Sequence, residues 1–253
     1  FIHGRDFGDC RYRQLCGIML SWEVIILAGG LGTRLRSVIN DRPKPMAEVQ
    51  NEPFLAHLMR YHVRRGAEHF VLSVGYKGTQ ISDFFGDDFD GVPISYAVEE
   101  KPLGTGGALI NSVGHLRSAN PCLLMNGDTF FPADLNRLTQ LHFRSGADLS
   151  LALFDATEAD RFGAVEFDEN GRVTSFDSGK AKLGHPANGG LYMISPKILP
   201  ALDKADVPLS FEETVIPGLI ASGHLVYATT QSASFIDIGL PTDYQLAQQA
   251  KFN

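Results

Sequence analysis

Three glycines separate an apolar run from a fixed positive charge in VIILAGGLGTRL, residues 24–35. Gly29, Gly30 and Gly32 carry no side chain, so a ligand can touch the main chain, and consecutive exposed amides form an anion-binding hollow. Arg34 adds a charge that persists at every accessible pH. Phosphate is the ligand that such a loop suits, although a tight turn beside an exposed arginine explains the same residues. The loop fits neither the G-x-G-x-x-G nor the P-loop pattern.

A second cation lies on a stiff stretch a few residues later. In RPKPM, residues 42–46, Lys44 stands between Pro43 and Pro45. Each proline fixes its own φ and biases the preceding residue towards extended backbone, so the direction of the lysine is restricted. The alternative is an ordinary solvated loop lysine. Beside the glycine-rich loop, this rigid lysine predicts two cations, Arg34 and Lys44, that hold a polyphosphate.

Two acids follow apolar runs farther along the chain. Asp128 ends PCLLMNGD, residues 121–128, and Asp237 lies in SFIDIG, residues 234–239. A carboxylate beside a buried strand is costly unless a cation or a hydrogen-bond donor accompanies it. Mg²⁺ prefers carboxylate and phosphate oxygens. Both acids are therefore candidate Mg²⁺ ligands, with the capping of a turn or helix as the alternative.

Strand-like and helix-like segments that alternate must position these residues. The apolar patterns predict strands and helices in turn over the first 155 residues: strands at 23–29, 69–75, 92–99, 121–128 and 147–154, and helices at 53–66, 77–86, 104–116 and 134–146. This rhythm predicts an α/β fold with a Rossmann-like, doubly wound, mostly parallel mixed sheet and helices on both faces. Such sheets bind ligands beyond the carboxyl ends of their strands, where the glycine-rich loop and Asp128 stand.

The pattern changes after residue 160. Residues 162–176 predict a hairpin with Asn170 and Gly171 at its tip. A strand is expected at 189–195, and a helix at 211–223 that Pro217 should kink or split. Two late strands and a helix at 241–252 complete the chain. We expect this part to form a smaller β-rich region that covers one end of the sheet.

Composition narrows the class of protein. The chain has 253 residues, a net charge of −7 and 44% hydrophobic residues, which predicts a packed core and disfavours a nucleic-acid binder. No apolar run approaches the roughly 18 residues of a membrane helix. Cys10, Cys16 and Cys122 show no zinc or redox spacing, which favours free thiols in the cytoplasm. Residues 1–22 show no clean period, and we interpret them as an extension of unknown role.

Several separated motifs together resemble one enzyme family. LAGGLGTRL followed by RPKPM resembles the sugar-1-phosphate nucleotidyltransferases over about residues 23–250. LSVGYK, PLGTGGA and NGDTFF add a resemblance to the subgroup of D-glycero-α-D-manno-heptose 1-phosphate guanylyltransferases. The resemblance implies one catalytic domain over residues 23–253, with a nucleotide-binding half at 23–155 and a sugar-binding half at 156–253. It also implies that a sugar 1-phosphate attacks a nucleoside triphosphate, GTP in this subgroup, with Mg²⁺ as cofactor, for polysaccharide assembly.

The family motifs carry roles over to positions of this chain. The resemblance implies catalytic roles for Arg34 and Lys44 and metal binding by Asp128 and Asp237. The implied nucleotide-binding residues are Leu27, Ala28, Gly29, Gly30, Gly32, Thr33, Glu99, Gly104 and Asn126. The implied sugar-phosphate-binding residues are Gly163, Glu166, Lys180, Asn188 and Gly189.

The assignment of Glu99 to the base has a chemical rationale, and the assignment of Lys180 to the sugar phosphate has a competing residue. Glu99 can only accept hydrogen bonds, which suits the N1–H and N2–H₂ donors of guanine, and Gly104 would let the base approach. A surface acid before a helix start is the alternative for Glu99. Lys180 departs from the E-K-P box of the family, so Lys182 competes with it. Glu212 or Glu213, in SFEET, could also contact the sugar.

Other functions stay open at this point. The same loop would serve uridylyl or thymidylyl transfer, or guanylyl transfer to mannose 1-phosphate. A nucleotidyltransferase-like regulatory module without turnover is a further alternative, which the complete set of Arg34, Lys44, Asp128 and Asp237 disfavours. The sequence leaves the formation of homo-oligomers open, and it predicts no nucleic-acid or membrane partner.

Overall fold

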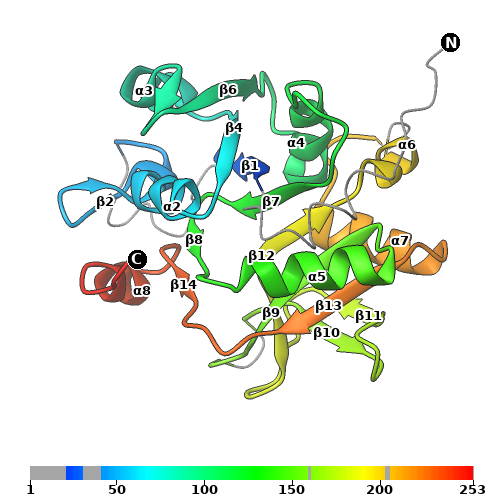
Figure 1. Cartoon of the computed structure of the whole chain (residues 1–253). Helices are drawn as coiled ribbons and strands as arrows, with labels where there is room; N and C mark the ends of the chain where they lie inside the picture. Colours follow the sequence, from blue (N-terminus) through cyan, green and yellow to red (C-terminus); the bar gives the residue numbers. More distant parts are fainter. Residues whose placement is uncertain (1–20, 31–40, 159–160, 203–205, 253) are drawn as a thin grey trace, which may run out of the picture.

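The computed structural model of the chain describes residues 21–30, 41–158, 161–202 and 206–252. Short and long strands alternate with helices (Figure 1). The strands are β1 (Trp22–Leu27), β2 (Glu48–Val49), β3 (Glu52–Pro53), β4 (Ala67–Val74), β5 (Asp88–Phe89), β6 (Val92–Val98), β7 (Cys122–Asn126), β8 (Thr129–Phe130), β9 (Leu149–Asp155), β10 (Ala164–Phe167), β11 (Val173–Asp177), β12 (Pro186–Ile194), β13 (Val226–Thr230) and β14 (Ile236–Asp237). The helices are η2 (Lys44–Met46), α2 (Phe54–Val63), α3 (Gly78–Phe85), α4 (Gly104–Val113), α5 (Leu135–Ser145), η3 (Pro196–Ile198), α6 (Leu199–Leu202), η4 (Phe211–Val215), α7 (Ile216–Ala221) and α8 (Pro241–Ala247).

Ten of the described strands form one mixed sheet. Strands β7, β1, β4 and β6 lie side by side in that order and run parallel. On the other side of β7, strand β12 runs antiparallel and continues the sheet to β9 and β10. Strand β13 then pairs with β9 in parallel. The α/β prediction with a mostly parallel mixed sheet is confirmed.

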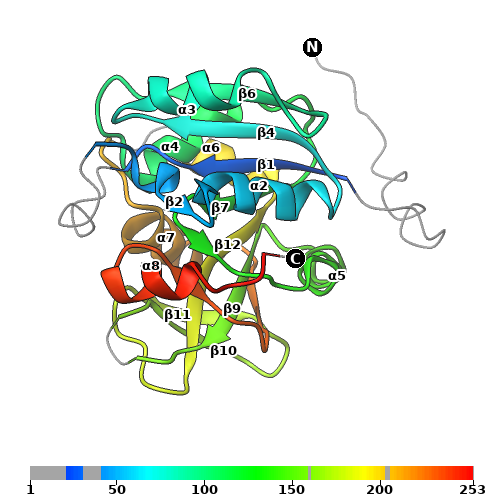
Figure 2. The ribbon, with the colours of Figure 1, turned by 90° about the vertical axis from the view of Figure 1, so that its left-hand side faces the viewer.

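Alternate residues of β1 face two separate parts of the core. Val24 and Ile26 pack in a cluster that contains Phe54 of α2, whereas Ile25 packs in a second cluster with Leu109 of α4. Successive side chains of a strand point to opposite faces, so these helices cover opposite faces of the sheet (Figure 2). The uninterrupted apolar run of this strand reflects burial on both faces.

Local sequence signals account for the boundaries of two helical segments. Asp134 accepts hydrogen bonds from the N–H groups of Asn136 and Arg137 at the start of α5, and Gly146 ends that helix at φ 63°. The predicted helix at 211–223 is divided, because η4 is a π-helix and α7 begins one residue before Pro217. A proline has no N–H for the preceding turn, so the helical type changes there.

The later part of the chain differs from the expected cover over one end of the sheet. Its strands extend the sheet, because the apolar β12 offers both edges for pairing, to β7 on one side and to β9 on the other. The predicted hairpin is present as β10 and β11. Asp168 accepts hydrogen bonds from the N–H groups of Asn170 and Arg172 at its tip, and Gly171 has a φ of 82°.

Two further expectations, that no helix crosses a membrane and that the cysteines are free thiols, are compared here with the described part of the chain. Within it, no helix combines the length and apolar character that a bilayer crossing requires. Cys122 is buried and forms no disulfide, and burial raises the pKa of its thiol to about 12. Cys10 and Cys16 lie outside the described residues.

Candidate active site

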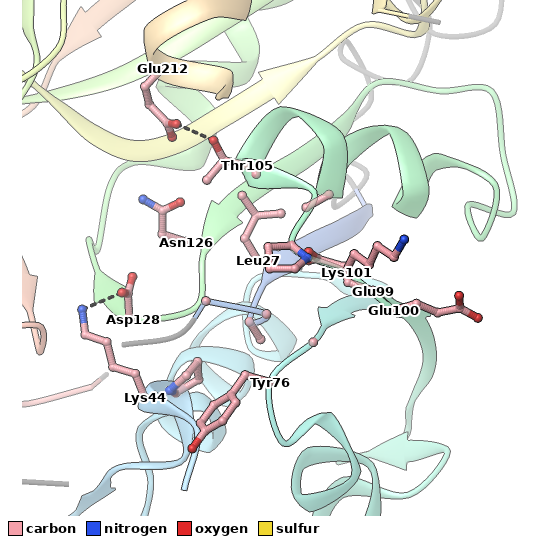
Figure 3. A pocket seen from close by; sticks show the side chains of 18 residues that line it. Leu27, Lys44, Tyr76, Glu99, Glu100, Lys101, Thr105, Asn126, Asp128 and Glu212 are labelled. Carbon is pink, nitrogen blue, oxygen red and sulfur yellow. Dashed lines mark hydrogen bonds and ion pairs between the residues drawn. The ribbon is translucent and has the colours of Figure 1, made fainter. Parts of the chain in front are cut away.

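A cavity of about 830 Å³ opens beyond the carboxyl ends of the parallel strands β1, β4, β6 and β7. This is the edge of the sheet at which the sequence predicts a ligand. Figure 3 shows Glu212 and Thr105 at one end of the cavity, Lys44 and Tyr76 at another, and Asn126 and Asp128 between them. The predicted site residues that line it are Leu27, Ala28, Gly29, Gly30, Lys44, Glu99, Gly104, Asn126 and Asp128.

Two of the three loop glycines fall within the described residues, and they differ in their surroundings. A Cβ at Gly29 would come within 2.5 Å of Glu99 Oε1, whereas a Cβ at Gly30 would meet nothing within 4 Å. Gly29 therefore admits a neighbouring carboxylate, and Gly30 leaves backbone open towards the cavity. Gly32, Thr33 and Arg34 lie outside the described residues, so their assigned roles stay predictions.

Lys44 brings the two candidate metal ligands together. Its Nζ lies 2.6 Å from Asp128 Oδ2 and 3.1 Å from Asp237 Oδ1, and the lysine side chain is 8% exposed. The residue begins η2, with Pro43 extended at φ −61° and ψ 146° before it. The two prolines thus aim the lysine inward, at the acids. A buried ammonium requires such partners, because charge burial is costly without them.

Main-chain pairing holds the two aspartates in register. Asp237 in β14 is paired with Thr129 in β8, and the N–H of Ile238 donates to the carbonyl of Asp128 at 3.1 Å. Gly239 N–H donates to Asp237 Oδ1 at 2.7 Å. Two acids far apart in the sequence therefore lie next to each other. Among the described residues, no cluster of three or more His, Cys, Asp or Glu side chains has the geometry of a metal site.

Arg161 is a second cation beside Asp237 that the sequence reasoning missed. Its guanidinium lies 3.7 Å from Asp237 Oδ2, and it forms ion pairs with Asp243 and Glu158. Burial opposes its charge, but the contacts with Asp243 and Glu158 outweigh burial and hold the pKa of Arg161 above its usual value. Asp237 therefore lies between two basic side chains, those of Lys44 and Arg161. No motif around Arg161 indicates this, because the contact joins β14 to a loop.

Glu99 follows β6 and is fixed by two donors. Its Oε1 accepts from the hydroxyl of Ser73 at 3.0 Å, and its Oε2 accepts from the N–H of Leu103 at 3.1 Å. Each carboxylate oxygen has a second lone pair. The side chain therefore ties the end of β4 to the loop before α4 and keeps capacity to accept from a ligand.

The structure gives a reason for a glycine at position 104, and this reason differs from the expected approach of a base. Its φ is 73°, and a Cβ there would overlap the carbonyl of Leu209. That carbonyl accepts from the N–H groups of Gly106 and Gly107 at 2.8 and 3.3 Å. The amides in the first turn of α4 are thus satisfied by the protein itself, and Gly104 lets the two segments touch.

The residues assigned to the sugar phosphate do not line the cavity. Glu166 is exposed on β10, and Lys180 forms an exposed ion pair with Asp177 at 2.9 Å. Lys182 is exposed as well. Gly189 packs against the ring of Phe131, which gives the glycine a packing role. These assignments stay predictions.

Gly163 and Asn188 are linked to each other and to the cavity rim. The N–H of Asn188 donates to the carbonyl of Gly163 at 2.9 Å. Asn188 Nδ2 donates to the hydroxyl of Tyr192 at 2.6 Å, and Tyr192 donates to Glu212 at 3.3 Å. Glu212 does line the cavity, whereas Glu213 is exposed to solvent.

Comparison with known proteins decides the family. The family described as nucleotidyl transferase matches residues 23–252. The chain belongs to the nucleotidyl transferase family. The resemblance to sugar-1-phosphate nucleotidyltransferases is thereby confirmed, and the protein is an enzyme of that class.

Curated relatives and solved structures resemble this nucleotidyltransferase over most of its length. The D-glycero-α-D-manno-heptose 1-phosphate guanylyltransferase of Aneurinibacillus thermoaerophilus is 39% identical over 90% of this chain and 97% of its own. Its namesake from Campylobacter jejuni is 37% identical over 88% and 96%. The crystal structure of HddC from Yersinia pseudotuberculosis is 33% identical, with a TM-score of 0.79 over 90% of this chain and 98% of that chain. HddC has also been solved in complex with GMP-PN.

Proposed function

We propose that this nucleotidyltransferase joins GTP to D-glycero-α-D-manno-heptose 1-phosphate and releases pyrophosphate, with Mg²⁺ as cofactor. Two relatives that bear this activity in their names are 39% and 37% identical to it along nearly their whole length. The single observation that carries the proposal is the convergence of Asp128, Asp237 and Lys44 at the strand-end cavity. The two carboxylates offer a position for a metal cation, and the ammonium group of Lys44 offers positive charge to a phosphate group.

The proposed reaction needs little covalent chemistry from the protein. An oxygen of the sugar phosphate forms a bond to the α-phosphorus of GTP, while the bond from that phosphorus to the bridging oxygen breaks. The electron pair of the broken bond leaves with pyrophosphate. The attacking phosphate is already ionised at neutral pH, so it needs no general base. The enzyme must bring two anions together and stabilise the charge that develops on pyrophosphate.

The donor set around Lys44 fits Mg²⁺. Asp128 and Asp237 present carboxylate oxygens to a single ammonium group, so this position already holds a cation between hard oxygen ligands. Mg²⁺ is commonly bound by one or two carboxylates together with substrate phosphates and water. When bound, it would supply electrophilic stabilisation of the phosphate oxygens. Lys44, relieved of its carboxylates, would then neutralise phosphate charge, together with Arg34.

Glu99 supports guanine as the base. Its carboxylate lies at the cavity beside the backbone of Gly29 and can only accept hydrogen bonds. Guanine offers two adjacent donors on its Watson–Crick edge, whereas uracil and thymine offer a single N3–H between two carbonyl oxygens whose negative partial charges would repel the carboxylate of Glu99. We therefore assign the end of the cavity near Glu99 to the base.

A donor-by-acceptor screen tests this proposal. GTP, ATP, CTP, UTP and dTTP are each combined with heptose, mannose or glucose 1-phosphate and Mg²⁺, and pyrophosphate release is measured. The pair of GTP with the heptose phosphate is expected to give the highest kcat/KM. Preference for a pyrimidine nucleotide would refute the base assignment, and preference for mannose 1-phosphate would refute the acceptor. No release with any pair would favour the regulatory module.

Two substitutions complete this test. Asp128→Asn and Arg34→Ala are expected to lower turnover by orders of magnitude, because each removes charge from the site of phosphoryl transfer. The circular dichroism spectrum and the unfolding temperature of each variant check that the fold is retained. Near-normal pyrophosphate release by both variants would contradict the proposed roles.

A further inference from the structure

Arg161 is a largely buried cation that joins the candidate metal site to helix α8. Its side chain is 11% exposed and lies in the loop between β9 and β10. The guanidinium nitrogen Nη2 forms an ion pair with Asp243 in the first turn of α8 and lies 3.7 Å from Asp237 Oδ2. The other terminal nitrogen, Nη1, forms an ion pair with Glu158 at 2.6 Å. Arg161 therefore divides its charge between a candidate metal ligand and two other acids.

The geometry of the guanidinium favours Asp243 over Asp237 as its partner. The contact with Asp243 is the shorter of the two, and both acids are largely buried, with side chains that are 16% and 12% exposed. The guanidinium carbon also lies over the ring of Phe162, 4.8 Å from its centroid. Nε is buried and has no hydrogen-bond partner among the residues that the structure describes. The position of the guanidinium is thus set at its terminal nitrogens, by the acids around it.

The charges around Asp237 are suited to a divalent cation. The connected ion pairs contain the carboxylates of Asp128, Asp237, Asp243 and Glu158 and the cations Lys44 and Arg161. Four carboxylates against two cations leave an excess of two negative charges, which equals the charge that one Mg²⁺ would bring. A guanidinium stays charged at every accessible pH, so Arg161 cannot leave this balance by losing its proton.

Arg161 and a metal ion compete for the carboxylate of Asp237. Like charges repel, so a guanidinium close to Asp237 lowers the affinity of this carboxylate for Mg²⁺. Asp243 opposes this effect, because its ion pair keeps the guanidinium 3.7 Å from Asp237, which is longer than a hydrogen bond. Glu158 is 56% exposed, and a solvated partner holds an arginine only weakly. Without Asp243, Asp237 would therefore be the strongest partner left for the guanidinium.

We infer that Arg161 and Asp243 are positioning residues that set the metal affinity of Asp237. The inference rests on the proposed function, because it takes Asp237 as a ligand of Mg²⁺. Arg161 weakens metal binding, and Asp243 restores it by drawing the guanidinium away. Helix α8, which carries Asp243, follows β14 along the chain and contacts it (Figure 1). The docking of this helix thus adjusts the metal site.

The affinity for Mn²⁺ tests the inference without any turnover. Mn²⁺ prefers the same oxygen ligands as Mg²⁺, and electron paramagnetic resonance of the free ion gives its dissociation constant from the full chain. Arg161→Gln should bind Mn²⁺ about 10-fold more tightly than the wild type, whereas Asp243→Asn should bind it about 10-fold more weakly. A merely structural role would weaken binding in both variants. Equal or weaker binding in Arg161→Gln, or equal or tighter binding in Asp243→Asn, overturns the inference.

The double variant shows whether Asp243 acts through Arg161. In the Arg161→Gln background, Asp243→Asn should change the Mn²⁺ dissociation constant by less than about 3-fold, because no guanidinium is left to approach Asp237. An equal weakening of about 10-fold in both backgrounds would mean that Asp243 acts by its own charge, and would overturn the inference.

Arg60 and Asp90 provide the matched control. Arg60 forms ion pairs with Glu52 and Asp90, at 2.7 and 3.3 Å, and neither acid is a candidate metal ligand. Arg60→Gln and Asp90→Asn should therefore keep the Mn²⁺ affinity of the wild type, and changes as large as those at Arg161 and Asp243 would overturn the inference. Circular dichroism checks that each variant folds. Should Arg161→Gln fail to fold, Asp243→Asn decides by itself, because it must bind Mn²⁺ more weakly.

Pyrophosphate release separates this inference from the proposed function. A wild type that binds Mn²⁺ but releases no pyrophosphate with any substrate pair refutes the proposed function, and the Mn²⁺ measurements still decide the roles of Arg161 and Asp243. Absence of Mn²⁺ binding to the wild type refutes the metal role of Asp237 and this inference together. Wild-type activity with the same Mn²⁺ affinity in the wild type, Arg161→Gln and Asp243→Asn refutes the inference alone.

Discussion

Gly239 leaves the space that the ammonium group of Lys44 occupies. A Cβ at Gly239 would overlap Lys44 Nζ and come within 2.7 Å of Asp237 Oδ1, the oxygen that already accepts from the N–H of Gly239. The contact of one lysine with two carboxylates therefore depends on a residue without a side chain after β14.

Gly239→Ala is expected to displace Lys44 from the two aspartates. The overlap should lower the free energy of unfolding by about 1–3 kcal/mol, as overpacking of a filled site does, and should lower kcat/KM for pyrophosphate release. Gly114→Ala is the control, because a Cβ at Gly114 would meet nothing within 4 Å. Equal activity and unfolding temperature in both variants would show that the space around Lys44 is not constrained.

Lys44→Met is expected to leave Asp128 and Asp237 without their shared cation. Turnover should fall by about 10²-fold or more, as for the removal of one electrostatic group at a transition state. Addition of Mg²⁺ should raise the unfolding temperature of Lys44→Met by more than that of the wild type, because the metal no longer competes with the ammonium. Lys197→Met, at an exposed position, controls for the loss of a charge. A smaller Mg²⁺ effect in Lys44→Met than in the wild type would argue against a metal between these carboxylates.

Gly104→Ala tests the docking of the Leu209 segment on α4. A non-glycine residue at a positive φ costs about 1 kcal/mol, and the overlap with the Leu209 carbonyl adds to this. Gly179→Ala isolates the first contribution, because Gly179 has a φ of 74° and open space around it. Chemical denaturation should show a clearly larger loss of unfolding free energy for Gly104→Ala than for Gly179→Ala. If the two variants lose the same free energy, the overlap with the Leu209 carbonyl is relieved without loss of stability, and the docking of the two segments is not constrained.

His62 makes the stability of the fold depend on pH. Its ring is buried on α2, and burial lowers the pKa of His62 from 6.5 to about 3, with Arg65 contributing. The unfolded chain therefore binds the proton more readily. The stability gained from the neutral ring is full above pH 6.5 and is lost as the pH falls towards 3.

His62→Leu should flatten this dependence. Between pH 7 and 4.5 the free energy of unfolding of the variant should decrease by about 2.5 kcal/mol less than that of the wild type, because the difference grows by about 1.4 kcal/mol per pH unit below pH 6.5. Denaturant titrations at both pH values measure the difference. His142, with a pKa lowered by burial to about 4, shifts stability in the same direction and should leave a residual slope in the variant. An unaltered slope would mean that His62 is not buried in its neutral form.

Local sequence patterns were sufficient for most elements. Largely apolar runs located β1, β4 and β7, because a strand buried on both faces is apolar at most positions. The alternating pattern of residues 92–99 located β6, whose buried and half-buried positions largely alternate. The capping residue Asp134 and the break at Pro217 act through neighbouring backbone, so their effects were predictable from the chain alone. The end of α8 was not predictable in this way: a helix was expected to residue 252, but α8 ends at Ala247 and Phe252 stacks on His57.

Glycines show the limit of reading a site from residue types. Gly104 and Gly189 were assigned to ligands, and these assignments stay predictions. Leu209 and Phe131 lie where their side chains would be, so a protein neighbour already accounts for each glycine. A missing Cβ looks the same in a sequence whether a ligand or the protein itself fills the space. The two cases are distinguished only by the identity of the neighbour, and that neighbour is distant along the chain.

The amino-acid sequence by itself determined the α/β class, the strand-end location of the cavity, the family, and Lys44, Asp128 and Asp237 as charged residues to examine. These follow from patterns within short windows, and from the rule that parallel strands present their carboxyl ends at one edge. Only the tertiary structure decided that Lys44 bridges the two aspartates, that Arg161 lies beside Asp237 and that Glu212 lines the cavity while Glu213 does not. Each of these depends on contacts between segments far apart in the chain, whose distances are set by the packing of the whole sheet.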